Sequence, residues 1–493
     1  MASQHILQAP TGTRDLYPIE AARRRFITEA WRRVAINHGF EEIDGPTFET
    51  TELYTKKSGE GIVSEIFGVF SGKDEAGVKV LGEKLARGED APAPYALRPE
   101  FTPTLARMYA AKAASLPKPT KWFSVGPYFR AERPQRGRLR EFLQWNADVL
   151  GGEPGSNLRL YDAEIIGLVV EFLSCVGLSS KDVRVKVGSR DAVRSSCAKY
   201  GVAEERFDAV LQLLDARPKI SVEEYESRAR VLELPSEFVK QHHPKDRAIV
   251  PLDASVDDIA RIFDLSRTQA VEVHAHHQEP GSLSQSIRDT GLATWCEYDS
   301  MIVRGLAYYT GTVFEVIVDN ERAVAGGGRY DNLIELFGGP PTPAVGFGMG
   351  DVVLSLVLQD KGLMPSDAEL MGLVGQSPDV FVISSGGTES ESQVPKLLAT
   401  LRRATPRTPL TKDSGPRTQD FSSPGLHARR SYKTTKNVGK LLQEAAKAGA
   451  RFAVIIESAS TAKLKDMITG AQEDRTYTLE DLPAELRRRL NRG

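Results

Sequence analysis

A basic stretch between two strand-like segments constrains the fold of this chain more than any other feature. Residues 130–140 read RAERPQRGRLR, with five arginines and one glutamate, and lie between KWFSVGPYF and EFLQWNADVLGG. Aromatic and β-branched residues favour strands, and two strands joined by a short loop with Gly and Pro predict a β-hairpin. Its tip would carry Arg133, Arg136 and Arg138. Planar guanidinium groups fit phosphate oxygens, so this row indicates a polyphosphate or a nucleic-acid backbone as ligand.

The composition limits that interpretation to a local surface. The chain has 493 residues, 64 Lys and Arg against 66 Asp and Glu, and a net charge of -2, so any nucleic-acid surface must be a patch. With 41% hydrophobic residues it can bury a core and is long enough for two to four domains. Cys175, Cys197 and Cys296 form no disulfide framework and no CxxC metal pair. Because we also find no secretion signal and no membrane span, we expect a cytoplasmic protein.

The first 95 residues predict a helix, an interrupted strand and a loop. Apolar residues recur at helical spacing over 19–38, before Gly39, which predicts an amphipathic helix. The segment FEEIDGPTFE follows, and its Pro46 cannot donate in a ladder, so this strand should lie at an edge or an interface. Residues 73–95 are rich in Gly, Pro and charge and are expected to form a loop.

A change of pattern divides the rest of the chain. Charged helical patterns replace strands over about residues 190–292, and strands resume at WCEYDSMIVRGLAYYTGTVFEVIVD. We therefore expect a helical insertion, with one sheet completed by sequence on both of its sides. After a composition break, strands and helices alternate, which predicts a separate α/β domain. The expected domains are 1–365, which contains the insertion, and 376–493.

Two further segments hold candidate ligand groups. LRPEFTPT places Glu100 and Thr102 beside a strand end, and VRGLAYYTG places Arg304, Tyr308 and Tyr309 in an otherwise apolar run. An arginine in such a run is costly to bury without an anionic partner, so Arg304 is a candidate ligand group. AGGGRYD and GFGMG put small residues where a backbone could approach a ligand closely, although such stretches also form simple turns.

Six motifs occur in an order typical of one enzyme family: GTRDLYP, LRPE.T, FRAERPQRGR.REF.Q, RGL.YYTGTVFE, AGGGRYDNL and AVGFGMG. Together they resemble the histidyl-tRNA synthetases, which are class II aminoacyl-tRNA synthetases. The resemblance covers about residues 10–360 outside the insertion, and RSYKTTKNVGKLLQEAAKAGARFAVIIES is similar to the anticodon-binding domain of that family. It implies an α+β catalytic domain with a mainly antiparallel class II synthetase sheet flanked by helices, the helical insertion, and a C-terminal α/β anticodon-binding domain.

The resemblance also implies an activity and the residues that perform it. The activity is ATP-dependent attachment of L-histidine to tRNA(His) through a histidyl-adenylate intermediate. Arg130 and Arg304 would be catalytic, because cations on opposite sides of the α-phosphate stabilise the charge that develops when a carboxylate attacks it. Arg133 and Gln135 would face the tRNA acceptor end. The implied ATP-binding residues are Arg130, Glu132, Arg138 and Phe142. The implied histidine-binding residues are Glu100, Thr102, Arg130, Gln144, Asp148, Arg304, Tyr308 and Tyr309.

Substrates and partners follow from the same resemblance. They are ATP with Mg²⁺, L-histidine and tRNA(His), with no metal bound by the protein itself and no membrane. The helix over 19–38 and the strand with Pro46 resemble class II motif 1, which forms subunit contacts. We therefore expect a homodimer with an isologous interface.

Three positions depart from the family pattern. Asp148 stands where the family usually has glutamate, Ala307 where it has aspartate, and Val353 where motif 3 has an arginine at the ATP γ-phosphate. The loss of that cation leaves two alternatives open. One is an inactive histidine-binding paralogue, the regulatory subunit of ATP phosphoribosyltransferase, and the other is a non-catalytic RNA-binding module. Such paralogues usually lack the anticodon-binding domain, whereas residues 401–440 carry ten Lys and Arg and only two Asp and Glu.

Overall fold

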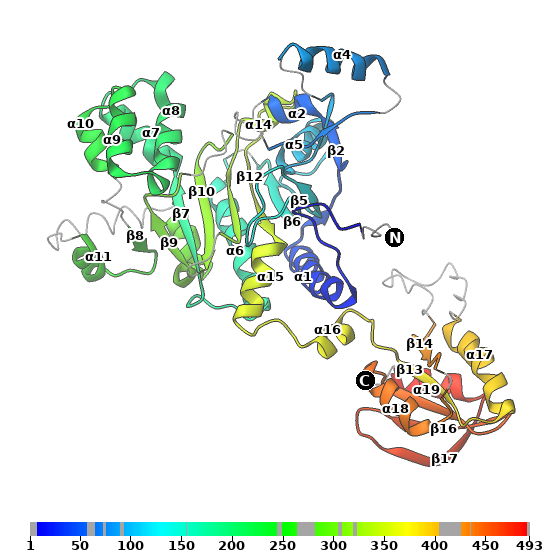
Figure 1. Cartoon of the computed structure of the whole chain (residues 1–493). Coiled ribbons are helices and arrows are strands. Elements are labelled where there is room, and N and C mark those ends of the chain that lie inside the picture. Colours follow the sequence, from blue (N-terminus) through cyan, green and yellow to red (C-terminus); the bar gives the residue numbers. More distant parts are fainter. Residues whose placement is uncertain are drawn as a thin grey trace. The chain divides into compact units, whose positions relative to one another are not determined.

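The computed structural model describes residues 7–56, 65–71, 75–88, 93–153, 155–243, 249–263, 282–303, 308–318, 323–403, 425–433 and 435–490 (Figure 1). The chain forms two compact units. The first comprises Met1–Tyr17 and Ile27–Met364, and the second comprises Pro18–Phe26 and Pro365–Gly493. This division does not test the expected domains 1–365 and 376–493, which stay a prediction.

A nine-stranded sheet forms the centre of the first unit, in the order β1-β5-β6-β12-β11-β10-β7-β9-β8. Neighbouring strands of this sheet pair antiparallel, except that β1 pairs parallel with β5 and β7 pairs parallel with β9. The predicted mainly antiparallel sheet is therefore confirmed. β7 precedes the insertion and β10, β11 and β12 follow it, so sequence from both sides completes the sheet. The strands are β1 (Glu41–Glu42), β5 (Thr120–Phe129), β6 (Glu141–Leu150), β7 (Val183–Ser189), β8 (Ile249–Pro251), β9 (Cys296–Asp299), β10 (Thr312–Val318), β11 (Ala325–Arg329) and β12 (Ala344–Gly350).

The predicted arginine hairpin is confirmed. β5 and β6 pair without a break from Thr120 opposite Leu150 to Phe129 opposite Glu141. At the tip, the backbone N–H of Gln135 donates to the carbonyl of Arg138 at 3.0 Å, and the N–H of Arg138 donates back at 2.8 Å. The turn between them needs a positive φ, and Gly137 supplies it at 77°.

Helices cover both faces of this sheet. On one face, Trp31 of α1 stacks on Trp145 of β6 with ring centroids 6.0 Å apart. On the other face, Tyr109 of α5 meets Trp122 of β5 edge-on at 6.1 Å. Because cross-strand partners share a face, the α5 side is also the side of Asp148, which lies opposite Trp122. The helices of the first unit outside the insertion are α1 (Pro18–Asn37, whose first nine residues belong to the second unit), α2 (Thr51–Thr55), α4 (Glu75–Ala86), α5 (Thr102–Ala110), α6 (Leu158–Cys175), α14 (Leu333–Leu336) and α15 (Asp351–Asp360).

Two of the N-terminal predictions are confirmed and one is wrong. The helix expected over 19–38 is α1, and Gly39 ends it with a φ of 76°. Pro46 lies between two edge strands, β1 of the large sheet and β2 of a small sheet in the order β2-β4-β3. The loop expected over 73–95 contains the helix α4 instead, because its Leu, Lys, Glu and Ala residues favour a helix enough to outweigh two glycines. The small sheet consists of β2 (Phe48–Thr50), β3 (Gly68–Val69) and β4 (Tyr95–Leu97).

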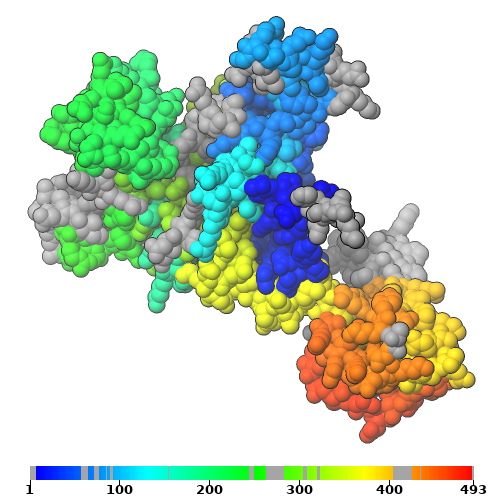
Figure 2. Space-filling view, viewed as in Figure 1, coloured from blue at the N-terminus to red at the C-terminus, as the bar shows by residue number. Residues whose placement is uncertain are grey.

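The insertion is only partly a separate helical subdomain. Its first four helices share a core of their own around Phe207, Leu214 and Tyr225, and they form one compact green group in Figure 2. Its later part joins the main sheet, because β8 pairs with β9 and α13 packs on α6. The helices are α7 (Arg190–Lys199), α8 (Phe207–Ala216), α9 (Val222–Val231), α10 (Ser236–Gln241), α11 (Val256–Phe263) and α13 (Leu283–Asp289).

The C-terminal part of the second unit is an α/β fold, as predicted. Its five-stranded sheet runs in the order β14-β13-β15-β16-β17, and β13 pairs parallel with both β14 and β15. Of the helices in the described part of the chain, none has the length and apolar character that crossing a bilayer requires. The elements are α16 (Asp367–Leu373), β13 (Val380–Ser384), α17 (Thr388–Arg402), β14 (Ala428–Arg430), α18 (Val438–Lys447), β15 (Phe452–Ile456), β16 (Thr461–Asp466), β17 (Gln472–Thr478) and α19 (Leu482–Leu490).

Candidate active site

β6 presents three of the predicted site residues to one face of the sheet. Successive side chains of a strand point to opposite faces, so Phe142, Gln144 and Asp148 share the face on which α5 packs. Trp145 points to the opposite face and packs against α1. The strand therefore carries the row Phe142, Gln144 and Asp148 on one face and an apolar side chain that anchors it on the other.

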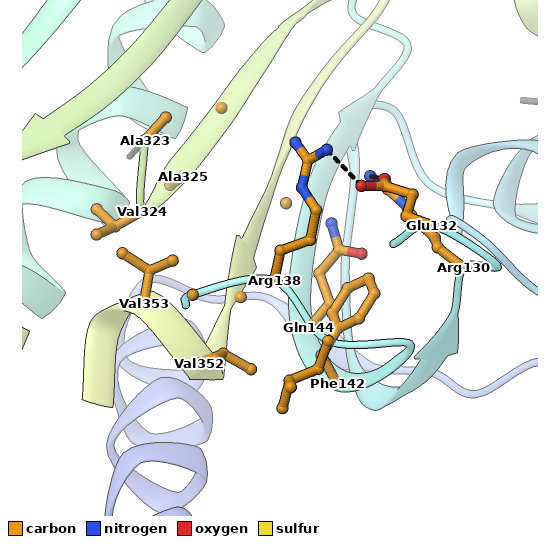
Figure 3. Close-up of a pocket in the computed structure, with 15 residues that line it drawn as sticks. Arg130, Glu132, Arg138, Phe142, Gln144, Ala323, Val324, Ala325, Val352 and Val353 are labelled. Atoms are coloured by element: carbon orange, nitrogen blue, oxygen red, sulfur yellow. Dashed lines mark ion pairs between the residues drawn. The ribbon is translucent and has the colours of Figure 1, made fainter. Parts of the chain in front are cut away.

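A cavity of about 210 Å³ lies at the end of this row, beside the hairpin (Figure 3). We call it the hairpin cavity. It brings together the four residues that the sequence predicts to bind ATP. Those four residues are Arg130, Glu132, Arg138 and Phe142. The other residues that line it are Gly137, Leu139, Gln144, Ala323, Val324, Ala325, Gly326, Gly348, Gly350, Val352 and Val353.

The charged groups of the cavity restrain one another. Glu132 forms an ion pair with Arg138 and lies 3.8 Å from the guanidinium of Arg130. The Nε of Arg130 donates to the carbonyl of Pro99 at 3.1 Å, and its guanidinium carbon lies 5.6 Å from the ring centroid of Phe142. The arginine that the sequence assigns to the α-phosphate is thus held in place before any ligand arrives, which limits the reorganisation needed during a reaction.

Glu65 is a member of this group that sequence reasoning missed. Burial raises the pKa of its carboxyl, the charge of Glu132 raises it further, and the charge of Arg130 lowers it. Its carbonyl also accepts the backbone N–H of Ala131 at 2.7 Å. Nothing in the sequence pattern pointed to it, because it lies far from the hairpin along the chain.

Two tyrosine–carboxylate pairs lie along the same face. The hydroxyl of Tyr308 donates to Glu100 at 2.6 Å, and that of Tyr330 donates to Asp148 at 2.5 Å. The two tyrosine rings are 6.0 Å apart, and the ring of Tyr309 lies 5.1 Å from that of Tyr308. Four of the predicted histidine-binding residues are thus buried together with Tyr330 in one polar cluster, and they are Glu100, Asp148, Tyr308 and Tyr309.

Burial controls the protonation of this cluster. It raises the pKa of Asp148 to about 7, although the hydrogen bond from Tyr330 lowers it in part. Burial and the neighbouring carboxylates raise the pKa values of Tyr308 and Tyr330 well above the usual value, so both remain hydrogen-bond donors. Tyr330 was not predicted as a site residue. Its position directly after AGGGR, at the end of β11, was the available signal.

The glycines of GFGMG make room for site side chains rather than for a turn. Gly346 lies opposite Asp148 on β6, and a Cβ there would come within 1.8 Å of Asp148 Oδ1. A Cβ on Gly348 would come within 1.9 Å of Gln144 Nε2. Any larger residue at these positions would displace a predicted histidine-binding side chain.

The remaining predicted residues are not all brought to this cluster. Arg304, with Ala307, lies outside the described residues. Thr102 is the first residue of α5, close to Tyr308. Arg133 and Gln135 are exposed at the hairpin tip, away from the cavity lining, which is where the sequence placed a contact with RNA.

A buried arginine contacts the backbone of both Val303 and Tyr309. Arg190, the first residue of α7, is 3% exposed. Its Nε donates to the carbonyl of Val303 at 3.0 Å, and its Nη1 donates to the carbonyl of Tyr309 at 2.8 Å. Arg190 therefore connects the backbone of Val303 to that of Tyr309. From the sequence, Arg190 is only the first residue of the expected insertion, and no contact with Val303 or Tyr309 could be predicted.

Val353 faces the hairpin tip. A Cβ on Gly137 would lie 3.1 Å from Val353 Cγ2, so the valine closes one side of the hairpin cavity. Its side chain offers no charge to a phosphate. Within the described part of the chain, no cluster of three or more His, Cys, Asp or Glu side chains is arranged to hold a metal ion.

A mainly antiparallel sheet with helices on both faces and an arginine hairpin beside its polar face is the class II aminoacyl-tRNA synthetase architecture. Comparison with known proteins narrows this class. A family model described as histidyl-tRNA synthetase matches residues 12–350. The histidine–tRNA ligase of Opitutus terrae is 36% identical over 392 residues, which are 78% of this chain and 80% of the relative. The chain belongs to the histidyl-tRNA synthetase family.

Solved structures agree on the fold. The histidyl-tRNA synthetase from Nostoc sp. PCC 7120 superposes with a TM-score of 0.66 at 23% identity, over 99% of this chain and 100% of that one. A protein from Bacillus halodurans, described as an ATP phosphoribosyltransferase regulatory subunit/histidyl-tRNA synthetase, gives a TM-score of 0.57 at 19% identity, over 81% of this chain and 90% of that one. At these identities the likeness concerns the fold alone.

Proposed function

We propose that this protein attaches L-histidine to tRNA(His) in an ATP-dependent reaction through histidyl-adenylate. The observation that carries the proposal is the hairpin cavity, which gathers Arg130, Arg138 and Glu132 around one space with Phe142 at its side. A nucleotide needs cations for its phosphates, a flat apolar surface for its base and a polar group that forms a hydrogen bond with the edge of the base. The cavity offers all three.

In the first step, a carboxylate oxygen of histidine attacks the α-phosphorus, and the bond to the bridging oxygen of pyrophosphate breaks. Two anions approach each other in this step, so fixed cations contribute more than any proton transfer. Arg130 would stabilise the α-phosphate and the histidine carboxylate, with Arg304 on the opposite side. Holding both substrates in line can lower the barrier by roughly 7 to 11 kcal/mol. The terminal ribose hydroxyl of tRNA then attacks the adenylate carbonyl.

Histidine would bind along the polar face of β6. Gln144 Oε1 is buried and accepts no hydrogen bond within the described part of the chain, so it is available to the α-amino group of a ligand. Glu100 and Tyr308 would complete that end, and Asp148 would accept from the imidazole. A site that pairs buried polar groups in this way rejects apolar analogues by about 10⁴ to 10⁵ without proofreading.

Mg²⁺ would enter with ATP, bound to the phosphate oxygens. Of the described residues that line the hairpin cavity, Glu132 is the one carboxylate, and it is paired with Arg138. The side chains present therefore suit a metal held mainly by the nucleotide. A bound Mg²⁺ would neutralise charge on the outer phosphates.

The regulatory-subunit alternative is less well supported. The fold does not separate the two, because one structural relative carries both descriptions. A regulatory subunit that binds only histidine has no use for two arginines in a cavity beside the histidine-binding face. Histidine-dependent pyrophosphate exchange by the wild-type protein would support the ligase, and no exchange at saturating ATP would contradict it.

We propose that the second unit binds the anticodon end of the tRNA. Its parallel strands β13 and β14 lead to helices on opposite faces of the sheet, and a cavity lies at the carboxyl ends of these strands. Arg430, Lys433 and Lys436 line it with three hydroxyl-bearing residues. Cations around a concave surface fit an RNA backbone.

Substitution of Lys433 and Lys436 by alanine should raise the tRNA Michaelis constant in aminoacylation by about tenfold, because two contacts with phosphates are lost. The slope of log affinity against log salt concentration should also become less steep by about one for each lysine. Pyrophosphate exchange without tRNA should be unchanged. The matched control replaces Lys447, at the opposite end of α18, and Arg451, which directly precedes β15; neither residue lines the cavity. An equal effect of both double substitutions on charging would contradict a specific RNA surface at this cavity.

We propose a homodimer formed by the motif 1 region. Phe48 of β2 is 52% exposed and meets the partly exposed Tyr95 edge-on at 5.8 Å, so this small sheet presents aromatic surface beside the Pro46 segment. Sedimentation of the protein at micromolar concentration should show a dimer, and a stable monomer would contradict it. A cytoplasmic location stays a prediction from the cysteine pattern.

A further inference from the structure

One buried carboxylate joins three segments around the hairpin cavity. Asp351 is the first residue of α15 and is 2% exposed. Its Oδ1 accepts the backbone N–H of Leu143 at 2.9 Å, and its Oδ2 lies 2.8 Å from Nη2 of Arg14. Both oxygens therefore have partners that are distant from α15 in the sequence.

Each end of this connection is adjacent to residues that line the cavity. Leu143 lies between Phe142 and Gln144 on β6, and Asp351 directly precedes Val352 and Val353. All four neighbours line the hairpin cavity, as Figure 3 shows. The hydrogen bond between Asp351 and Leu143 thus fixes two walls of the cavity relative to each other. Misplacement of bound reactants by about 1 Å can cost 10²-fold in rate, so the position of these walls matters.

The segment that carries Arg14 is itself fixed to the hairpin. The carbonyl of Gly12 accepts the backbone N–H of Arg140 at 2.8 Å and that of Glu141 at 3.3 Å. Gly12 has a φ of 88°, and a Cβ there would lie 2.8 Å from side-chain carbons of Pro134 and Arg140. This approach requires glycine. The N-terminal segment therefore brings Arg14 to Asp351 with little freedom.

The charges explain why Asp351 needs this partner. A carboxylate that is almost fully buried is costly to leave unpaired, and an unneutralised one would repel the phosphates of a nucleotide in the adjoining cavity. Val353, two residues further on, supplies no compensating cation. Arg14 does so, although it is not one of the residues that line the cavity.

We propose that Arg14 and Asp351 are a pair of positioning residues for adenylate formation. Asp351 aligns the start of α15 with β6, and Arg14 neutralises its charge so that ATP can bind beside it. The inference rests on the proposed function, because it assumes that the hairpin cavity holds ATP.

A double-substitution cycle in the full-length protein tests the pair. The variants are Arg14→Met, Asp351→Asn and their combination, and the readout is the ATP and histidine Michaelis constants in pyrophosphate exchange. Arg14→Met leaves a buried carboxylate unneutralised and should raise the ATP constant at least about tenfold, with the histidine constant within about twofold. The combined variant removes both charges and should recover most of the loss. Arg14→Lys keeps the charge and should stay within about threefold of wild type.

The control is Asp182→Asn. Asp182 pairs with Lys361 at 2.9 Å at the opposite end of α15, so this variant loosens the helix without touching the cavity and should leave the ATP constant unchanged. The inference is wrong if the effects of Arg14→Met and Asp351→Asn simply add. It is also wrong if both Michaelis constants, the turnover number and the melting temperature change together. A wild-type protein without exchange activity would instead contradict the proposed function.

Discussion

Replacement of Arg130 by alanine should lower histidine-dependent pyrophosphate exchange by about 10² to 10³-fold, the usual cost of losing one fixed group that stabilises charge in a transition state. Its Nε is held by the carbonyl of Pro99 at 3.1 Å, and its guanidinium lies over the ring of Phe142. Because the cation is oriented before substrates bind, its loss should lower the turnover number as well as kcat/KM. Arg130→Lys keeps the charge without the planar fork and should recover only part of the rate.

Arg136→Ala is the matched control for this experiment. Arg136 belongs to the same hairpin, but its side chain is 67% exposed and pairs with Asp360 at 2.9 Å on the surface. An exposed ion pair contributes little, so exchange should stay within about twofold of wild type. If both alanine variants lose activity equally, the hairpin as a whole has been disrupted. Wild-type exchange by Arg130→Ala would remove this residue from the catalytic set.

The parts of the site that the sequence predicted are local in the chain. The spacing of Phe142, Gln144 and Asp148 by even numbers on one strand places them on one face without any tertiary information. The hairpin likewise follows from two strand patterns and a basic Gly-containing loop. Such inferences succeed because the period of a strand and the geometry of a turn depend on neighbouring residues alone.

The parts that the sequence did not predict depend on contacts between distant segments. The hydroxyl of Tyr330 reaches Asp148 across 182 positions of sequence, and Arg14 reaches Asp351 across 337. No local pattern encodes such pairs, since each requires the complete order of strands in the sheet. The helix α4 differs from the expected loop for a local reason, because the helix-forming residues of Glu75–Ala86 outweigh its two glycines.

Val353 illustrates how the structure changes the meaning of a residue. In the sequence it is a missing cation, which favours an inactive paralogue. In the structure it closes the cavity against the hairpin tip at Gly137, and the charge of the neighbouring Asp351 is neutralised by Arg14. The ligase proposal therefore depends on how the remaining cations are arranged as well as on their number.

Substitution of Asp148 by asparagine should remove the part of the pH dependence of histidine binding that comes from the ionisation of this carboxyl. Burial raises the pKa of Asp148 to about 7, so the carboxyl is mostly protonated at pH 6 and mostly ionised at pH 8. Only the ionised form accepts a hydrogen bond with both oxygens. The wild-type Michaelis constant for histidine should therefore fall as the pH rises, by about tenfold over this range. Loss of one charge-assisted hydrogen bond, about 1.5 to 3 kcal/mol, should raise the constant of Asp148→Asn about 10- to 100-fold at pH 8.

The imidazole of free histidine titrates in the same pH range, but it does so equally for both proteins. The ratio of the two Michaelis constants therefore isolates the carboxyl of Asp148. Tyr330→Phe gives an independent check, because the hydroxyl of Tyr330 donates to Asp148 and thereby favours the carboxylate. Its removal should move the midpoint of the wild-type profile to higher pH. A ratio of the two Michaelis constants that is constant from pH 6 to 8 would show that Asp148 does not bind the imidazole of histidine. A midpoint that moves to lower pH in Tyr330→Phe would show the same.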